Sequence, residues 1–284
     1  MDEPADLTQR FEAHRPHLRA VAYRMLGSLH EADDAVQEAW LRLHRSDSDA
    51  VGNLAGWLTT VVARIALDML RSRASRREQP FDALPDPVVT AVGTDPEGSA
   101  VLADTVSLAL LVVLQTLSPA ERLVFVLHDL FAVPFDEIAR VVDRTPAATK
   151  QLASRARRRV RGQAPAPAGD LARQQEVVAA FLAATRTGDL DGLLAVLDPD
   201  IVLRVDQGSG VRLLRGAAVV AGQALTYARL TPEGRPAVVN GGAGVVTLVD
   251  GRPVSVLAMT VRDGRIVEID ILADRPRLAG LPLP

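Results

Sequence analysis

The fold of the middle of the chain is decided by residues 118–160, which read SPAERLVFVLHDLFAVPFDEIARVVDRTPAATKQLASRARRRV. The stretch opens with a capping box, Ser118 to Glu121, that has proline at the first helical position, and this predicts a helix running to about Phe131. A short helix over 135–142, a tight turn, and a helix opened by Pro146 follow. Two short helices with arginines on the second predict a helix-turn-helix.

The second helix of this motif carries polar side chains suited to DNA. A recognition helix places its amino-terminal turns in the major groove, where side chains reach base edges and flanking arginines hold phosphates. The expected base-reading residues are Thr149, Lys150, Gln151, Ser154 and Arg155. The expected phosphate contacts are Arg157, Arg158, Arg159 and Arg161. An ordinary helical hairpin is the alternative, and the basic cluster disfavours it.

Charge is unevenly distributed along the chain. The 32 basic and 35 acidic side chains give a net charge of -3, but residues 106–162 hold nine basic against five acidic ones. Arginines gather further at 71–77 and 155–161. Two basic clusters in a nearly neutral chain favour two separate contacts with a polyanion, with two solvated helix ends as the alternative.

The residues before this motif predict an all-helical unit. Residues 7–45 read as two helices separated by a turn at Gly27, and 53–73 is the most periodic helix of the chain. The second helix has an acidic stripe that includes Asp34 and Glu38. Such a row of carboxylates repels DNA, so we expect it to face either solvent or a basic protein surface.

Two linkers and a third unit complete the chain. Residues 79–104 are rich in proline and carry only acidic charge, and 163–170 are rich in proline and alanine. Beyond them, helical patterns give way to alternating strands with aspartate-glycine hairpin turns at 250–251 and 263–264. The expected fold is therefore multidomain, with two all-α domains followed by an α+β domain that has a curved antiparallel sheet. The expected boundaries are 1–78, 79–104, 105–162, 163–170 and 171–284.

The composition excludes several classes of chemistry. The chain has no cysteine, so it has no disulfide, thiolate metal site or cysteine nucleophile. No stretch approaches the length and apolarity of a membrane helix or a signal peptide. We expect a cytoplasmic protein without metal or cofactor.

In this order the parts resemble sigma factors of bacterial RNA polymerase, specifically the extracytoplasmic-function (ECF) group that carries only sigma domains 2 and 4. EADDAVQEAWLRLHR at 31–45 is similar to the region that binds the polymerase clamp. NLAGWLTTVVARIALDMLRSR at 53–73 is similar to the promoter-melting and minus-ten region, and 118–160 to the minus-thirty-five reader. The tail, with VVNGGAGVVTLVDGRPVSV and VRDGRIVEIDIL, resembles the SnoaL-like cone domain fused to one subgroup.

The resemblance implies roles for particular residues. The implied polymerase-binding residues are Asp33, Asp34, Glu38 and Trp40. The implied minus-ten residues are Asn53, Arg64, Arg71, Arg73, Arg76 and Arg77. The loop 46–53 would hold an unstacked base of the opened strand.

The subgroup also implies contacts between the linker and the tail. Residues 83–87, ALPDP, resemble a linker motif that begins with tryptophan, here Ala83. DQGSG at 206–210 resembles the subgroup's glycine-rich aspartate motif, and DRPRL at 274–278 loosely resembles its terminal motif. The implied interdomain regulatory residues are Leu84, Pro85, Asp86, Asp206, Gly208, Asn240 and Gly241.

The function implied is that of an alternative sigma factor, which is not an enzyme. It would bind core RNA polymerase and promoter DNA, and its C-terminal domain, with a small ligand or a regulatory protein as a further partner, would modulate activity. One alternative is a ligand-responsive helix-turn-helix regulator that acts without polymerase. The other is a SnoaL-like cyclase; however, no histidine follows residue 162, and we expect Asp206 and Asp270 to be turn or surface carboxylates.

Overall fold

The protein is described here by a computed structural model, in which residues 3–45, 53–75, 83–93, 106–163, 170–230 and 233–283 are described. The chain forms two compact units. One consists of Met1–Pro80 and Val113–Gln163, and the other of Phe81–Val112 and Ala164–Pro284. The division falls within one helix, α5 (Leu108–Gln115).

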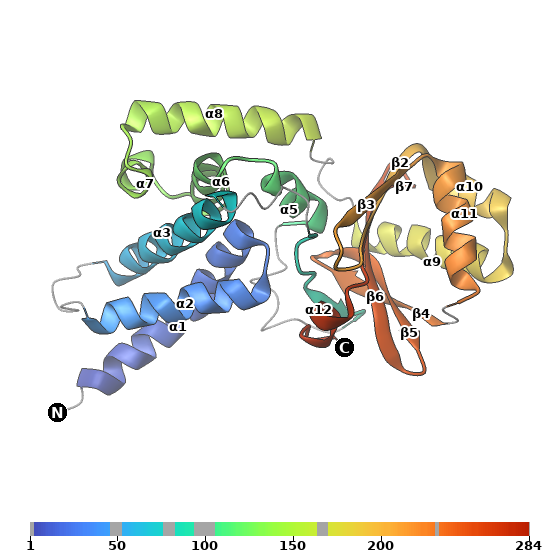
Figure 1. The fold of residues 1–284 in the computed structure, drawn as a ribbon, viewed down its shortest axis with the longest axis horizontal. Helices are drawn as coiled ribbons and strands as arrows, with labels where there is room; N and C mark the ends of the chain where they lie inside the picture. Colours follow the sequence, from blue (N-terminus) through green and yellow to red (C-terminus); the bar gives the residue numbers. More distant parts are fainter. Residues whose placement is uncertain are drawn as a thin grey trace. The chain divides into compact units, whose positions relative to one another are not determined.

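The first unit is built from helices in the part of the chain that is described (Figure 1). They are α1 (Glu3–Leu26), α2 (Leu29–Arg45), α3 (Leu54–Ser75), α6 (Pro119–Phe125), the π-helical turn η2 (Val126–Leu130), α7 (Phe135–Val142) and α8 (Pro146–Gln163). Fully buried side chains such as Leu18, Leu43 and Leu58 join α1, α2 and α3 into one core. The apolar spacing on these helices therefore predicts their packing correctly.

The predicted helix-turn-helix is confirmed. The Ser118 hydroxyl accepts the Glu121 N–H, and the Glu121 carboxylate accepts the Ser118 N–H, so the capping box is complete. Helix α7 ends at Asp143, whose left-handed backbone (φ 56°) reverses the chain before α8 begins. Helix α7 buries Ile138 and Val142 against its neighbours.

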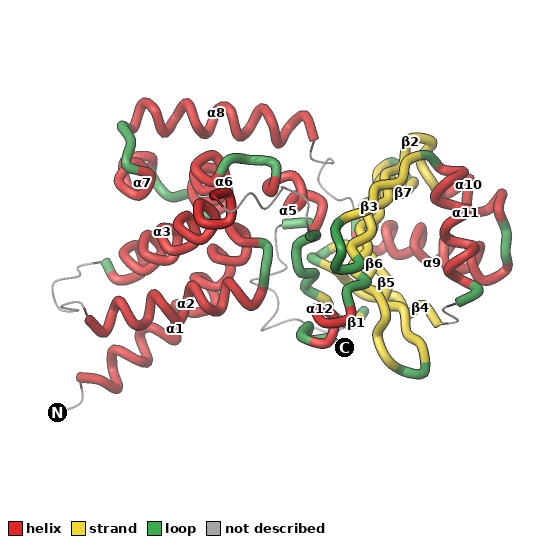
Figure 2. The backbone as a smooth tube through the Cα atoms, in the orientation of Figure 1, coloured by secondary structure: helices red, strands yellow, loops and turns green. Residues whose placement is uncertain are grey.

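The second unit is a curved sheet covered on one face by helices (Figure 2). Its strands are β1 (Val89–Ala91), β2 (Leu197–Asp206), β3 (Val211–Arg215), β4 (Glu233–Val239), β5 (Gly242–Val249), β6 (Arg252–Arg262) and β7 (Arg265–Leu272). They lie in the order β1-β4-β5-β6-β7-β2-β3, and only the β2–β7 pair is parallel. The covering helices are α9 (Leu171–Thr187), α10 (Leu190–Val196) and α11 (Ala217–Ala228).

Tight turns set the register of the long strands. Asp250-Gly251 and Asp263-Gly264 both have positive φ at both residues, which confirms the two predicted hairpins. A third turn of this kind, Asn240-Gly241, joins β4 to β5. This helix-covered curved sheet is the SnoaL-like cone that the resemblance implied.

The expected linker over 79–104 differs from the structure in one respect. Residues 83–93 are extended, as their prolines predict, but they belong to the second unit rather than to a free connection. Strand β1 pairs with β4 and so becomes an edge of the sheet. The reason is that Val88 and Val89 bury their side chains while the backbone of β4 satisfies that of β1.

On the sheet face opposite α9, the short helix α12 (Arg275–Ala279) packs against β6 (Figure 1). None of the described helices combines the length and the apolarity needed to cross a bilayer.

Candidate functional site

Helix α8 presents most of the expected base-reading side chains to solvent. Lys150, Gln151 and Ser154 are exposed, and the Lys150 ammonium lies 5.9 Å from the centroid of the Phe135 ring. The prediction that Thr149 is exposed is wrong, because its side chain is 0% exposed and its hydroxyl donates to the Thr145 carbonyl at 3.0 Å. A β-branched threonine can return its hydroxyl to the preceding turn, and this places its methyl group in the core.

The arginines of α8 are partly neutralised within the first unit. Arg155 and Arg159 lie 3.3 and 3.1 Å from the two oxygens of Glu121. Although burial acts to raise it, the pKa of Glu121 is held below its ordinary value by hydrogen bonds from Ser118 and by these two guanidinium groups. The Glu121 carboxylate thus fixes Arg155 and Arg159 on the recognition helix.

Two further arginines of α8 differ in their surroundings. Arg157 donates to Asp129 at 2.6 Å, whereas Arg158 is exposed and has no ion pair with any described residue. Arg161 is also exposed. Arg158 is therefore a cation in this helix that is available to a phosphate.

Helix α2 exposes the expected acidic residues. Asp33, Asp34 and Glu38 each retain 40% or more of their side-chain accessibility. Each lies beside a basic group of the same unit, in the pairs Arg19–Asp33, His30–Asp34 and Arg42–Glu38. Surface pairs of this kind are weak and exchange readily for a partner surface. Trp40 is half-buried, with its ring 4.8 Å from Phe11 and 4.4 Å from His44.

Helix α3 carries the expected minus-ten residues. Asn53 caps the helix by accepting the Gly56 N–H at 3.0 Å, and Arg71 is exposed beside Asp68. Arg64 is exposed, and its guanidinium donates to the Arg140 carbonyl of α7 at 2.9 Å. Arg76, Arg77 and residues 46–52 of the expected base pocket lie outside the described residues.

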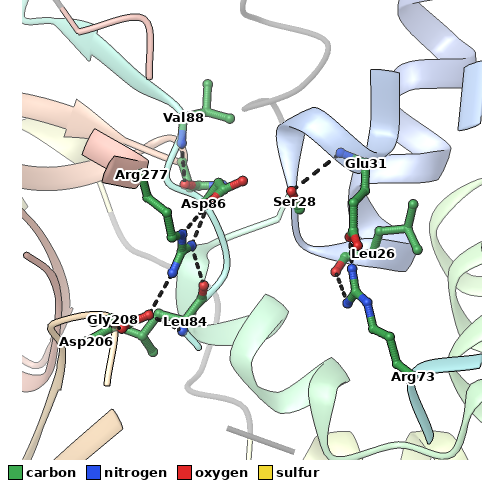
Figure 3. A network of polar contacts seen from close by, with 11 residues as sticks. Leu26, Ser28, Glu31, Arg73, Leu84, Asp86, Val88, Asp206, Gly208 and Arg277 are labelled. Carbon is green, nitrogen blue, oxygen red and sulfur yellow. Dashed lines mark hydrogen bonds and ion pairs between the residues drawn. The ribbon is translucent and has the colours of Figure 1, made fainter. Parts of the chain in front are cut away.

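Arg73 departs from the expected phosphate role. Its guanidinium forms an ion pair with Glu31 of α2 and donates to the Leu26 carbonyl (Figure 3). Because the side chain is held inside the helical unit by these contacts, the structure argues against its being a free phosphate contact. For the same reason Glu31 does not join the exposed acidic face of α2.

A buried arginine that the sequence did not single out joins the two helical modules. The Arg122 guanidinium of α6 is 4% exposed and donates to the Arg24 carbonyl at the end of α1 through two nitrogens, each at 3.3 Å. Burial, together with the nearby charge of Arg73, lowers the pKa of Arg122 to about 9. Arg122 and Arg64 both donate across the contact to backbone carbonyls that end or lie near the end of helices.

The linker and the tail meet at a cluster that we call the linker latch, defined by Leu84, Asp86, Asp206 and Arg277 (Figure 3). The Leu84 N–H donates to an Asp206 oxygen at 2.8 Å, and Arg277 Nη1 donates to the same oxygen at 2.7 Å. Arg277 Nη2 donates to the Leu84 carbonyl at 2.6 Å, and Nε donates to Asp86 at 3.0 Å. One guanidinium therefore joins two carboxylates and one backbone carbonyl.

The latch continues along the linker. The Val88 N–H donates to the Asn240 side-chain oxygen at 3.0 Å, and the Asn240 N–H donates to the Val88 carbonyl at 2.8 Å. Gly208 (φ 89°) turns its N–H to the second oxygen of Asp206 at 3.0 Å. Pro85 is buried within the same stretch, whereas Gly241 is exposed in the β4–β5 turn, where it supplies the left-handed conformation.

Arg277 is the functional residue that sequence reasoning missed. Its partners Asp86 and Asp206 are 191 and 71 residues away, and no local pattern reports such a contact. The only signal in the sequence was its place within the loosely matching terminal stretch 274–278.

The expectation for Asp206 and Asp270 is wrong, since both are 1% exposed. Asp270 lies 2.9 Å from Arg204, and burial raises the pKa of Asp270 to about 6 although Arg204 opposes the shift. Neither carboxylate faces the hollow of the cone. Strand alternation instead places the neighbours Val205, Ile269 and Ile271 there.

That hollow is a cavity of about 410 Å³ between the sheet and helices α9 and α11. Its lining is mostly apolar, and no acidic residue or histidine lines it among the residues that the structure describes. Nor do the described residues contain a cluster of three side chains able to hold a metal ion. The cavity thus lacks the acid that a cyclase of this fold would use.

Comparisons with known proteins agree with this architecture. Residues 10–76 match the family model described as Sigma-70 region 2, and residues 107–160 match the model described as Sigma-70, region 4. The chain is 41% identical over 292 residues to the ECF RNA polymerase sigma factor SigJ of Mycobacterium tuberculosis strain H37Rv, a match that covers 96% of this chain and 93% of the relative. The chain belongs to the ECF sigma factors of RNA polymerase.

Two further matches extend over nearly the whole chain. A probable ECF RNA polymerase sigma factor, SigI of Mycobacterium tuberculosis strain CDC 1551, is 35% identical over 289 residues, covering 99% of this chain and 98% of that protein. The crystal structure of Mycobacterium tuberculosis SigJ superposes with a TM-score of 0.79 at 38% identity, covering 98% of this chain and 100% of that one. The chain is thus a transcription initiation factor with a fused C-terminal domain and not an enzyme.

Proposed function

We propose that the C-terminal unit of this sigma factor restrains initiation by holding the linker through the latch. In this proposal the two helical modules bind core RNA polymerase and promoter DNA, as those of a sigma factor do. The latch decides how much of the linker is free to let them separate. The observation that carries the proposal is the Arg277 guanidinium, which donates to Asp86, Asp206 and the Leu84 carbonyl at once.

The length of chain that the latch withholds supports a restraint. Residues 84–91 are bound along the C-terminal sheet, from the Leu84 contacts to the end of β1. An extended residue spans about 3.3 to 3.6 Å, so these eight residues represent roughly 28 Å of reach. The two promoter elements lie apart on DNA, so a linker with more free length can serve both modules with less strain.

The assignment of surfaces follows from exposure and charge. Lys150, Gln151, Ser154 and Arg155 are proposed to read base edges, with Arg158 on a phosphate. The exposed carboxylates of α2, together with Trp40, are proposed to bind a basic surface of the polymerase. The exposed arginines of α3 and the stretch 76–77 are proposed for the minus-ten strand. Since the partner enzyme and the DNA are cytoplasmic, so is the site of action.

Transcription in vitro from a library of randomised promoters tests the proposal for any promoter sequence. Core RNA polymerase with the wild-type chain should yield transcripts that share upstream elements. Arg277→Ala should raise their yield severalfold, and Arg275→Ala, the matched change at an exposed arginine of the same helix, should not. An unchanged yield for Arg277→Ala, measured alongside faster hydrogen exchange of residues 83–93, would refute the restraint.

A further inference from the structure

We infer that the cavity of the C-terminal cone binds a largely apolar carboxylic acid, and that binding tightens the linker latch. The inference rests on the proposed restraint and adds the ligand that controls it.

The volume and lining of the cavity suit an apolar chain. Its volume, about 410 Å³, lies within the range of sites that enclose small molecules. The buried part of its wall is aliphatic and aromatic, with Phe181, Leu203, Val245 and Ile269 contributing. A ligand without an apolar body would leave this surface unpaired with anything but water.

The rim of the cavity supplies the polar end of the site. Three lining residues are exposed and therefore lie at the opening: Arg186, Gln207 and Tyr227. Gln207 Nε2 donates to the Tyr227 hydroxyl at 3.2 Å, and Arg186 Nε donates to the Leu182 carbonyl at 3.2 Å. With one cation and no acid among the described lining residues, the electrostatics of the site favour an anion. A carboxylate at the rim with its chain inside satisfies both halves.

The cavity and the latch share the end of strand β2. Val205 and Gln207 line the cavity, while Asp206 between them faces the linker. The Ala273 N–H donates to the Asp206 carbonyl at 2.7 Å, and Ala273 also lines the cavity. The Asp206 side chain, which holds Leu84 and Arg277, is thus flanked on both sides by cavity wall.

This sharing makes the two events thermodynamically linked. When Arg277 and Leu84 let go of Asp206, the wall segments that Asp206 positions lose their support, so the unlatched form binds a ligand less well. By reciprocity, a ligand that prefers the latched form shifts the linker towards the latched form by the same factor.

The test uses dodecanoate as the probe and dodecylammonium as its cationic counterpart, titrated calorimetrically into the full chain. Dodecanoate should bind at least tenfold more tightly than dodecylammonium. Ala224→Phe, which fills the cavity from α11, should weaken dodecanoate at least tenfold, while Val219→Phe at an exposed position of α11 should not. Arg186→Gln, which leaves the core untouched, should bring the two probes to within about threefold of one another.

Coupling is read by hydrogen exchange of residues 83–93. At a dodecanoate concentration ten times its Kd, exchange should slow by up to about elevenfold, and Arg277→Ala should weaken dodecanoate binding. Equal affinity for the two probes, or no binding, overturns the ligand inference, and unaltered exchange with bound dodecanoate overturns the coupling. These failures are distinct from failure of the proposed function, which is an unchanged transcript yield for Arg277→Ala without any probe.

Discussion

The guanidinium of Arg277 donates to the carboxylate of Asp86, which lies 191 residues earlier in the chain. The contact ties the last helix of the C-terminal unit to the segment between the two sigma modules. A short terminal stretch therefore holds a part of the chain on which promoter recognition depends.

Removing this arginine should destabilise the second unit. Arg277→Ala leaves Asp206, 1% exposed, without its charged partner, and uncompensated buried charges cost several kcal/mol. We expect a loss of about 2 to 4 kcal/mol in the free energy of unfolding of this unit, measured by urea denaturation followed by circular dichroism. Arg275→Ala should stay within about 0.5 kcal/mol of the wild type. Equal losses for the two variants would show that Arg277 does not neutralise Asp206.

Asp270 should give the second unit a distinctive pH dependence. Its folded pKa, about 6, is above the unfolded value, so between pH 4 and 6 the folded chain holds a proton that the unfolded chain has released. The stability contributed at this site is therefore greatest at low pH and falls as the pH rises through 6. At pH 7 the accumulated cost is on the order of 3 kcal/mol.

Asp270→Asn removes that dependence. From pH 4.5 to pH 7.5, the unfolding free energy of the variant should rise relative to that of the wild type, as measured by urea titration at each pH. Asp200→Asn, at an exposed position of β2, should show no such trend. A constant difference between Asp270→Asn and the wild type across the pH range would contradict the raised pKa.

The recognition helix should separate base reading from phosphate binding. Arg155→Ala should cost about 1 to 3 kcal/mol in promoter binding by the holoenzyme and relax preference at one position of the minus-thirty-five element. Arg158→Ala should weaken all sequences alike and lower the salt dependence. Both are measured by binding to a library of element variants at two salt concentrations. A uniform loss for Arg155→Ala would instead make it a phosphate contact.

The acidic face of α2 should be required for assembly with polymerase. Reversing Asp34 and Glu38 to lysine together should abolish co-purification with core RNA polymerase while leaving the circular dichroism spectrum intact, because both side chains are exposed. The control reverses two exposed carboxylates of the second unit, Glu176 and Asp200, and should retain binding. Undiminished binding by the α2 variant would return this face to solvent.

Local signals in the sequence were sufficient for the elements. The capping box at Ser118, the turn before Pro146 and the two aspartate-glycine pairs each depend on hydrogen bonds or φ values within a few residues, so the sequence alone predicts them. The acidic face of α2 and the exposed group on α8 followed from helical spacing. Thr149 was misplaced because its hydroxyl can be satisfied by its own helix, which lets a polar residue enter the core.

Contacts between distant segments were decided by the tertiary structure alone. The pairing of Arg73 with Glu31, the burial of Arg122 and the attachment of β1 to β4 bring together residues that no periodicity relates. The latch is the clearest case, since the environment of Arg277 consists of side chains from three parts of the chain. Sequence therefore determined which helices, strands and turns form, because those depend on local bonding; which charges are buried together depended on packing, because burial is a property of the whole unit.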